Sequence, residues 1–302
     1  MTIIGLRTYW YSISAVLVAA SIGALAVWGF NFGIDFSGGS LMELEFTGNN
    51  VPSEIIRDTF QREEIIISTF QQTGESGVLI RTRDLDEETH QRVISALHGA
   101  GTEFTEKRFV SIGPVIGSEL KRKAVIALLL VVVMIVLYIA WAFRHVSKPI
   151  TSWKYGLVAI AALLHDVLIP AGLFSYLGAT RGVEIDALFV TALLTVLGFS
   201  VHDTIVIFDR IRENLQRYKG ISFEEVVERS VQENIIRSIN TSLTLFFVLV
   251  TLFIFGSEST RYFALALGVG TIVGTYSSIF FACPILVTWQ HWQDKRRARA
   301  SS

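Results

Sequence analysis

Six stretches of the chain are apolar almost without interruption. Each reaches about 20 residues, the length at which a helix crosses a hydrocarbon core about 30 Å thick. They lie near 10–30, 124–143, 155–177, 187–208, 239–256 and 262–288. A buried helix of a soluble protein is shorter and has one polar face. The pattern therefore predicts a polytopic α-helical membrane protein with six transmembrane helices.

The segment between the first and second apolar stretches has a soluble pattern. Alternating and helical periodicities predict, in order, a strand over 41–46, a helix over 52–63, strands over 65–70 and 78–82 joined by a hairpin turn at 73–77, a helix over 85–97 and a strand over 104–110. The order βαββαβ is that of a ferredoxin-like domain, which hosts many functions. We expect His90 and His98 to lie on an exposed helix and to bind no metal.

These patterns divide the chain into four parts. Residues 1–32 form the N-terminal segment with the first transmembrane helix, and 33–120 form the inserted domain. Residues 121–292 hold the other five helices, with a loop at about 209–236, and 293–302 form a basic tail.

Composition supports the assignment as a membrane protein, and the distribution of charge predicts how the chain is oriented in the membrane. Charged residues make up 18% of the chain and hydrophobic residues 51%, whereas soluble domains average about 25% charged. Basic residues collect in three segments: Arg144, His145, Lys148 and Lys154; Arg210, Arg212, Arg217 and Lys219; Lys295, Arg296, Arg297 and Arg299. The positive-inside rule predicts that both termini and the 209–236 loop are cytoplasmic and that the inserted domain is external. Lys121, Arg122 and Lys123 oppose this orientation but are outnumbered.

Ionisable side chains within the predicted spans are candidates for function, because each costs at least about 2.5 kcal/mol to insert. They are His165 and Asp166 in the third span, His202, Asp203 and Asp209 in the fourth, and Arg237 at the start of the fifth. Asn240, Thr241 and Thr244 follow Arg237 at helical spacing and predict one polar stripe, which must face protein or water.

An aspartate that meets and leaves an arginine changes its protonation state as helices move. Asp203 with Arg237 as its movable partner can therefore couple proton passage to conformational work. The alternative is a static buried ion pair that fixes helix packing, and spacing alone does not decide between them.

Other sequence patterns indicate close helix packing, or argue against particular classes of enzyme. Small residues recur every four positions in the last span and predict close helix packing: Ala266, Gly270, Gly274 and Ser278. The sequence has no Walker A, HExxH or GxSxG motif. Its only cysteine, Cys283, lies in the last span, so the inserted domain has no disulfide. We expect no cofactor or metal, with protons as the coupling ion.

Four stretches resemble the SecF family of bacterial protein export. They are 33–39 (GIDFSGG), 112–120 (IGPVIGSEL), 199–214 (FSVHDTIVIFDRIREN) and 237–244 (RSINTSLT). Together with the arrangement of one span, an inserted domain and five further spans, the resemblance covers nearly the whole chain.

The resemblance implies an RND-type half-transporter that pairs with SecD in the bacterial inner membrane. It also implies work beside the SecYEG channel on a translocating polypeptide, driven by the proton-motive force, within membrane lipid and without nucleic acid. The family's membrane carboxylate and arginine correspond to Asp203 and Arg237, with Asp166 and Asp209 as further relay candidates. The signature residues Gly33, Asp35, Gly38 and Gly39 are expected to act as a hinge to the external domain. His202 departs from the asparagine usual at this position and joins the relay or only hydrogen-bonds.

Three other functions are consistent with six spans and buried charges. A passive scaffold would use no protons. A small-molecule RND-like exporter usually has larger external domains and both halves in one chain. An intramembrane aspartyl protease would use Asp166 and Asp203 as a pair sharing a proton, but the chain lacks a GxGD-type motif. Proton stoichiometry, the polypeptide-binding and SecD contact surfaces, the conformational state and titration of His202 do not follow from the sequence.

Overall fold

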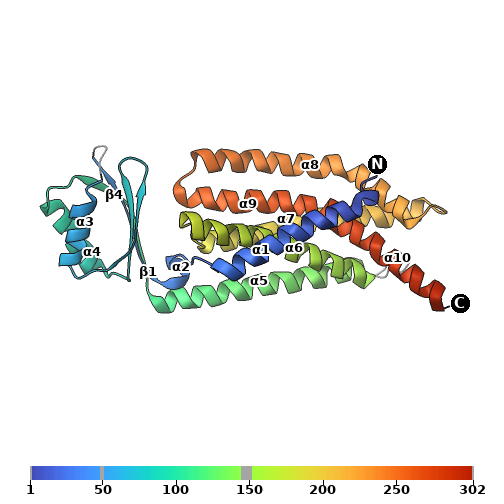
Figure 1. Cartoon of the computed structure of the whole chain (residues 1–302), viewed down its shortest axis with the longest axis horizontal. Helices are drawn as coiled ribbons and strands as arrows, with labels where there is room; N and C mark the ends of the chain where they lie inside the picture. Colours follow the sequence, from blue (N-terminus) through green and yellow to red (C-terminus); the bar gives the residue numbers. More distant parts are fainter. Residues whose placement is uncertain (1, 48–50, 144–151, 301–302) are drawn as a thin grey trace. The chain divides into compact units, whose positions relative to one another are not determined.

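The computed structural model describes residues 2–47, 51–143 and 152–300 (Figure 1). Within these residues, six helical stretches are long and apolar enough to cross a membrane, as predicted. They are α1 (Arg7–Trp28), preceded by the short turn η1 (Ile4–Leu6), α5 (Pro114–Ala142), α6 (Ser152–Arg181), α7 (Ala187–Arg217), α8 (Phe223–Phe255), and the run of α9 (Glu258–Tyr276), η2 (Ser277–Ala282) and α10 (Cys283–Ala300). The basic residues Arg144, His145 and Lys148 lie outside the described residues.

The chain forms two compact units. An α/β unit spans Phe32–Val125, and a helical unit combines Met1–Asn31 with Ile126–Ser302. The boundary after Val125 falls inside α5, so one continuous helix contributes to both units.

The α/β unit has the predicted βαββαβ order, preceded by a short helix α2 (Ile34–Ser37). Its elements are β1 (Gly39–Phe46), α3 (Ser53–Arg62), β2 (Ile67–Thr73), β3 (Gly77–Thr82), α4 (Glu87–Gly99) and β4 (Phe104–Ile112). The strands pair antiparallel in the order β2-β3-β1-β4. Figure 1 shows α3 and α4 on one face of this sheet, the ferredoxin-like arrangement.

The core of this unit lies between the sheet and the two helices. Met42, Leu44 and Phe46 of β1 pack there against Ile56 and Phe60 of α3. They alternate along β1, as the period of two requires.

Two details of the inserted unit differ from the prediction. The second strand begins at Ile67, because Glu64 adopts a positive φ of 56° after α3 and Ile65 enters the core before the strand starts. The expectation of an exposed His90 is wrong. His90 is 4% exposed and shares the sheet-facing side of α4 with Val93 and Leu97, as spacings of three and seven require.

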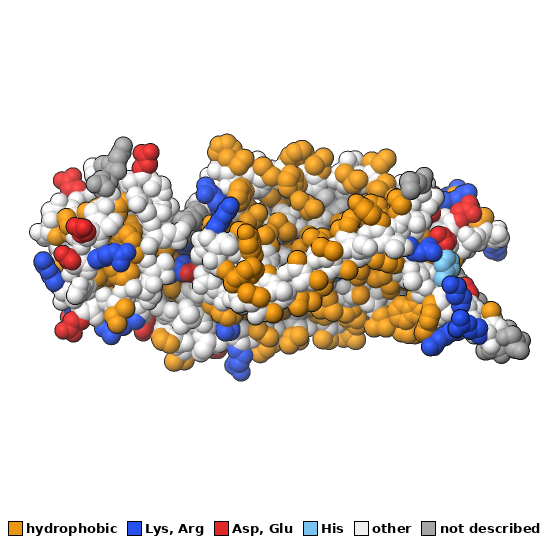
Figure 2. All heavy atoms as spheres, in the orientation of Figure 1, with side chains coloured by type: hydrophobic (Ala, Val, Ile, Leu, Met, Phe, Trp, Pro, Cys, Tyr) orange, Lys and Arg blue, Asp and Glu red, His pale blue; other side chains and the backbone are white. Residues whose placement is uncertain are grey.

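The helical unit has a core of apolar side chains and an apolar surface. Large apolar residues are exposed on α1, α5 and α8, among them Val27, Leu129 and Phe255, and Figure 2 shows this hydrophobic surface over the bundle. A soluble protein rarely exposes so large an apolar patch, so the surface fits contact with lipid or with other membrane helices.

The last span changes its winding halfway along. Ser277–Ala282 form a π-helical segment, η2, between α9 and α10. Pro284 follows one residue later, after Cys283; it lacks an N–H, and its ring crowds the carbonyl four residues earlier. The wider turn precedes this proline, and the Cys283 thiol donates a hydrogen bond to the Ser278 carbonyl, five residues earlier. Segments of this kind often lie at functional positions.

Candidate functional site

Asp203 lies in the middle of α7 and contacts α8. Ser238 donates a hydrogen bond of 2.6 Å to its Oδ1 atom. The other carboxylate oxygen, Oδ2, is buried and has no hydrogen-bond partner among the described residues. A buried unpaired carboxylate oxygen is costly. This position is therefore able to accept a proton or a new donor when the surrounding helices move.

Arg237 precedes Ser238 on α8 but is exposed on the surface of the chain. Arg237 and His202, which is also exposed, lie within electrostatic range of Asp203. Because Oδ2 of Asp203 is unpaired, the guanidinium does not hydrogen-bond to it in this arrangement. Asp203 and Arg237 therefore lie near each other without a hydrogen bond between Arg237 and the Oδ2 atom.

The predicted polar stripe after Arg237 lies on the outer face of α8. Asn240, Thr241 and Thr244 are exposed. The Thr241 hydroxyl donates to the Arg237 carbonyl at 2.9 Å, and the Thr244 hydroxyl donates to the Asn240 carbonyl at 2.8 Å. The hydroxyls are satisfied by their own helix, whereas the Arg237 side chain is exposed on a helix long enough to cross a membrane, where a charge requires a protein or water environment.

A second polar stripe on α8 was not predicted. Asn234, Ser238 and Ser242 recur every four residues and are buried against the bundle. Ser242 hydrogen-bonds to Thr275 of α9, and Ser238 holds Asp203. Their i, i+4 spacing was visible in the sequence, but serine is common in packed membrane helices and carries no charge.

A cavity of about 630 Å³ reaches Arg237 from the end of the helices. It is lined by residues of α5, α7 and α8, including Asp209, Arg210 and Glu233. Asp209 itself is paired with Arg212 at 3.2 Å, one turn along α7. The cavity brings Asp209 and Arg237 to one polar space.

Asp166 lies in a different environment, fully buried on α6. His165 Nδ1 is 2.9 Å from its Oδ1 atom, and the Ser277 hydroxyl donates to Oδ2 at 2.7 Å. The Ser200 hydroxyl also donates to Oδ2. Asp166 therefore connects three elements of the bundle, α6, α7 and η2, with both oxygens satisfied. Neither serine was singled out from the sequence.

The small residues of the last span lie against α7. A Cβ atom added at Gly270 would be 2.2 Å from Cγ2 of Val196, and one at Gly274 would be 3.0 Å from Cβ of Ser200. The contact at Gly274 brings α9 close to the serine that holds Asp166.

The signature segment 33–39 is ordered rather than an open loop. Ile34–Ser37 form α2, with the Phe36 and Ser37 amides donating to the Gly33 carbonyl. Asp35 lies in the first turn of α2. Gly38 and Gly39 follow, at two positions where only glycine fits.

Gly38 and Gly39 have φ values of 75° and 121°. A Cβ atom at Gly38 would be 2.8 Å from Cα of Pro114, and one at Gly39 would be 2.7 Å from the Thr82 carbonyl. Side chains are excluded at both positions by conformation and by contact. The pair packs the start of β1 against the residues that lead into α5.

The chain is similar to known proteins over the segments described above. Residues 92–292 match the family described as protein export membrane protein SecD/SecF, C-terminal, and residues 23–49 match the SecD/SecF GG motif. The SecF protein translocase subunit of Thermobaculum terrenum is 41% identical over 297 residues, covering 94% of this chain and 92% of that protein.

Longer relatives have a segment that is similar to this chain. The SecDF protein translocase subunit of Brucella abortus is 35% identical over 278 residues, covering 90% of this chain and 35% of that protein. The crystal structure of SecDF, a translocon-associated membrane protein from Thermus thermophilus, superposes with a TM-score of 0.81 at 32% identity. It covers 96% of this chain and 39% of that chain. The family models, the near full-length relative and the shared six-helix fold agree, and the chain belongs to the SecF family of protein-export membrane proteins.

Proposed function

We propose that this chain is the SecF subunit of a Sec protein translocase, that it pairs with SecD, and that the proton-motive force drives its part in polypeptide export beside the SecYEG channel. One observation carries the proton-coupled part of the proposal: the buried Oδ2 atom of Asp203 has no hydrogen-bond partner in the described chain, and Arg237 lies nearby without reaching it. A carboxylate in this state gains most from a proton or from the guanidinium, and it exchanges one for the other as α7 and α8 shift.

The cavity at Arg237 supplies one side of the proton path. Its polar residues, Asp209 among them, give water access to the guanidinium from one end of the helices. His202 is exposed beside Asp203 and is suited to pass protons from outside the chain. In this scheme a proton on Asp203 weakens its attraction to Arg237, and the helix pair moves.

SecD is the partner that covers the exposed polar face of α8. The exposed Arg237 charge and Asn240 amide on this face are costly to insert into lipid. Relatives named SecDF, of which this chain covers 35% to 39%, support SecD as that partner. A SecD helix with polar side chains would complete the environment of Arg237.

The proposed orientation places both termini in the cytoplasm and the α/β unit outside. It rests on the basic tail at Lys295, Arg296 and Arg297. The only native cysteine, Cys283, is buried, so single cysteines report topology directly. Glu75→Cys, in the β2–β3 turn, should react with an impermeant maleimide in intact cells, and Ser302→Cys only after permeabilisation. The reverse pattern contradicts the orientation.

In the proposed scheme, the segment at Gly38 and Gly39 couples the membrane helices to the external unit. Both glycines make close backbone contacts within the α/β unit, so a side chain at either position would disturb the packing of this segment. The translocating polypeptide would be held by the external unit during that movement.

Export of a reporter preprotein tests the proposal in cells depleted of the native subunit. Asp203→Asn and Arg237→Ala are compared with wild type at matched expression, with and without a proton gradient. Both should abolish the gradient-dependent part of export. Arg229→Ala is the matched control, because Arg229 lies two turns earlier on α8, where it pairs with Glu225. Normal export by Asp203→Asn would contradict the proton-coupled mechanism and leave a passive scaffold as the function.

A paired-aspartate protease fits the geometry poorly. Asp166 is satisfied by His165, Ser200 and Ser277, whereas Asp203 is held by Ser238. The two carboxylates have separate hydrogen-bond partners and do not share a proton, as an aspartyl pair must.

A further inference from the structure

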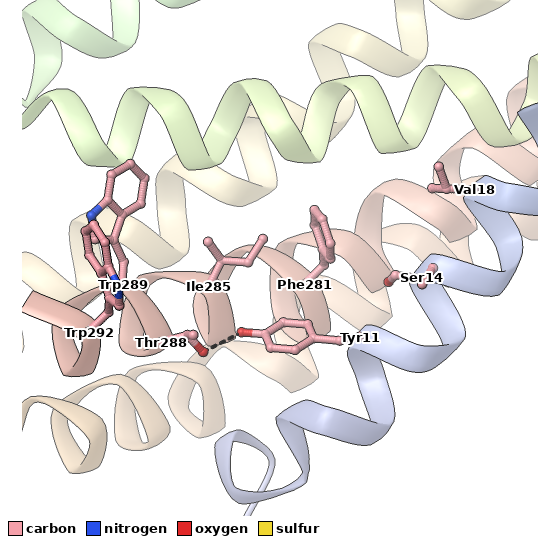
Figure 3. Close-up of a pocket in the computed structure, with 9 residues that line it drawn as sticks. Tyr11, Ser14, Val18, Phe281, Ile285, Thr288, Trp289 and Trp292 are labelled. Atoms are coloured by element: carbon pink, nitrogen blue, oxygen red, sulfur yellow. Dashed lines mark hydrogen bonds between the residues drawn. The ribbon is translucent and has the colours of Figure 1, made fainter.

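A groove between the first and last spans has no part in the proton pathway. It has a volume of about 750 Å³ and lies between α1 and the run of η2 and α10. Figure 3 shows Val18 near one end, Phe281 and Ile285 along the wall, and Trp289 and Trp292 at the other end. All of these residues belong to the helical unit.

The groove is built for an apolar occupant. Its hydroxyl groups have partners: the Tyr11 and Thr288 hydroxyls are 2.8 Å apart, and the Ser14 hydroxyl is 3.2 Å from that of Tyr276, which does not line the groove. From Phe281 to Trp292 the helix rises about 16 Å, close to half of a hydrocarbon core about 30 Å thick. The groove therefore has the length of an acyl chain within a single leaflet.

The tryptophans mark the level of the membrane interface. Trp292 is 50% exposed, and Trp153 of α6 is 55% exposed and stacks edge-on against Trp289 at 5.3 Å. Tryptophan concentrates where hydrocarbon meets headgroups. The end of the groove at Trp289 and Trp292 thus lies at headgroup depth, and the end at Val18 lies towards the membrane interior.

Positive charge gathers at this end of the groove. The Arg296 guanidinium lies 3.8 Å from the centre of the Trp292 ring, and the neighbouring Lys295 and Arg297 are exposed. Figure 2 shows basic side chains grouped at this end of the helical unit. The nearby Glu224 is paired with Arg7 at 3.0 Å. The excess positive charge attracts an anionic headgroup.

We propose that this groove binds one anionic phospholipid, with an acyl chain between α1 and α10 and its headgroup beside Arg296. The bound lipid would fix the last span against the first at the membrane end where both termini lie. The site needs neither Asp203 nor Arg237.

Native mass spectrometry of the full-length chain tests the site with dioleoyl phosphatidylglycerol and dioleoyl phosphatidylcholine at equal concentration. Wild type should retain one phosphatidylglycerol, roughly tenfold more than phosphatidylcholine. Ala15→Phe fills the groove and should lower retention of both lipids by a similar factor. Ala20→Phe, also exposed on α1 but outside the groove, is the control. Equal retention by the two variants overturns the proposal.

The charge is tested separately by replacing Lys295, Arg296 and Arg297 with Gln. Retention of phosphatidylglycerol should fall to that of phosphatidylcholine. The same loss of charge at Lys121, Arg122 and Lys123, at the start of α5, should leave the preference unchanged. No preference in wild type overturns the proposal. If Ala15→Phe instead lowers recovery of SecD and leaves lipid retention unchanged, a partner helix occupies the groove and the proposal fails.

A fluorescence-quenching measurement tests the same site without the Ala15→Phe variant. Brominated phosphatidylglycerol in nanodiscs should quench the fluorescence of wild type more than brominated phosphatidylcholine does. The excess quenching should disappear in a variant in which Trp289, Trp292 and the adjacent Trp153 are all replaced by Phe. Excess quenching that persists in this variant places the lipid elsewhere and overturns the proposal, even if Ala15→Phe does not fold.

Discussion

Ser238 donates a hydrogen bond of 2.6 Å to Asp203, and it is the only described side chain that hydrogen-bonds to this carboxylate. Its neighbour in sequence, Arg237, projects to the outer surface of the same helix. Consecutive residues of α8 therefore have opposite relations to Asp203: the hydroxyl holds it from inside the chain, and the charge acts on it from outside.

Replacement of Ser238 by Ala should lower the gradient-dependent part of export by about tenfold. Hydrogen bonds to charged groups contribute about 1.5–3 kcal/mol, and 1.4 kcal/mol corresponds to a factor of ten. The reporter assay above measures the effect. Ser238→Thr keeps the hydroxyl and should restore export, which a mere loss of packing would not explain. Full activity of Ser238→Ala would show that Asp203 does not depend on this donor.

Asp166→Asn should destabilise the bundle by about 3 kcal/mol, because the hydrogen bonds that Ser200 and Ser277 donate to one carboxylate oxygen are weaker when the acceptor is a neutral amide oxygen. Thermal unfolding of the purified chain in detergent measures the loss. Asp294→Asn, at an exposed position on α10, is the control. Unchanged stability together with loss of gradient-dependent export would instead make Asp166 a member of the proton relay.

Gly270→Ala should cost about 1–3 kcal/mol through overpacking. The added Cβ would be 2.2 Å from Val196, which forces α9 and α7 apart. Gly268→Ala on the same helix is matched in chemistry, but its nearest neighbour is Leu249 at 3.9 Å. Thermal unfolding should separate the two variants, and equal melting temperatures would contradict the close contact between α9 and α7.

Glu228→Ala should release the N-terminal turn. The Glu228 carboxylate accepts hydrogen bonds from the Ile3 and Ile4 amides at 3.0 and 2.8 Å, so α8 holds the start of the chain. Limited proteolysis of the full-length protein should cleave before Arg7 faster in this variant. Glu225→Ala, one turn earlier and exposed, provides the control. Similar cleavage rates for the two variants would argue against the anchor.

Asp86 caps α4 and should make that helix sensitive to pH. The Thr89 side chain, and then the Thr89 amide, which donates to the carboxylate at 2.8 Å, lower the pKa of this carboxyl below its usual value. A lowered folded-state pKa gives stability that is present above the unfolded value of about 3.9 and is lost as pH falls through the folded value. Asp86→Ala should therefore reduce hydrogen-exchange protection of α4 at neutral pH and less at low pH. A difference independent of pH would contradict the cap.

Much of the architecture could be predicted from local pattern. Long apolar runs define membrane spans whatever surrounds them, and the alternation in 41–46 defined the central strand. The burial of His90 does not follow from its residue type; it follows from the spacing of His90 from Val93 and Leu97, which puts all three on the buried side of α4. The start of the second strand depended on a positive φ at Glu64, which the sequence does not signal.

The sequence by itself determined the class of protein, its six spans and the charged residues that must matter within them, because hydrophobic length and the cost of burying charge are local properties. Only the tertiary structure decided the relations among those charges. It joined Asp166 to Ser200 and Ser277, left one oxygen of Asp203 unpaired, and turned Arg237 outward while Ser238 faced inward. These outcomes depend on the rotation of each helix about its axis, which is set by close packing at residues such as Gly270 and Val196 rather than by the composition of any single helix.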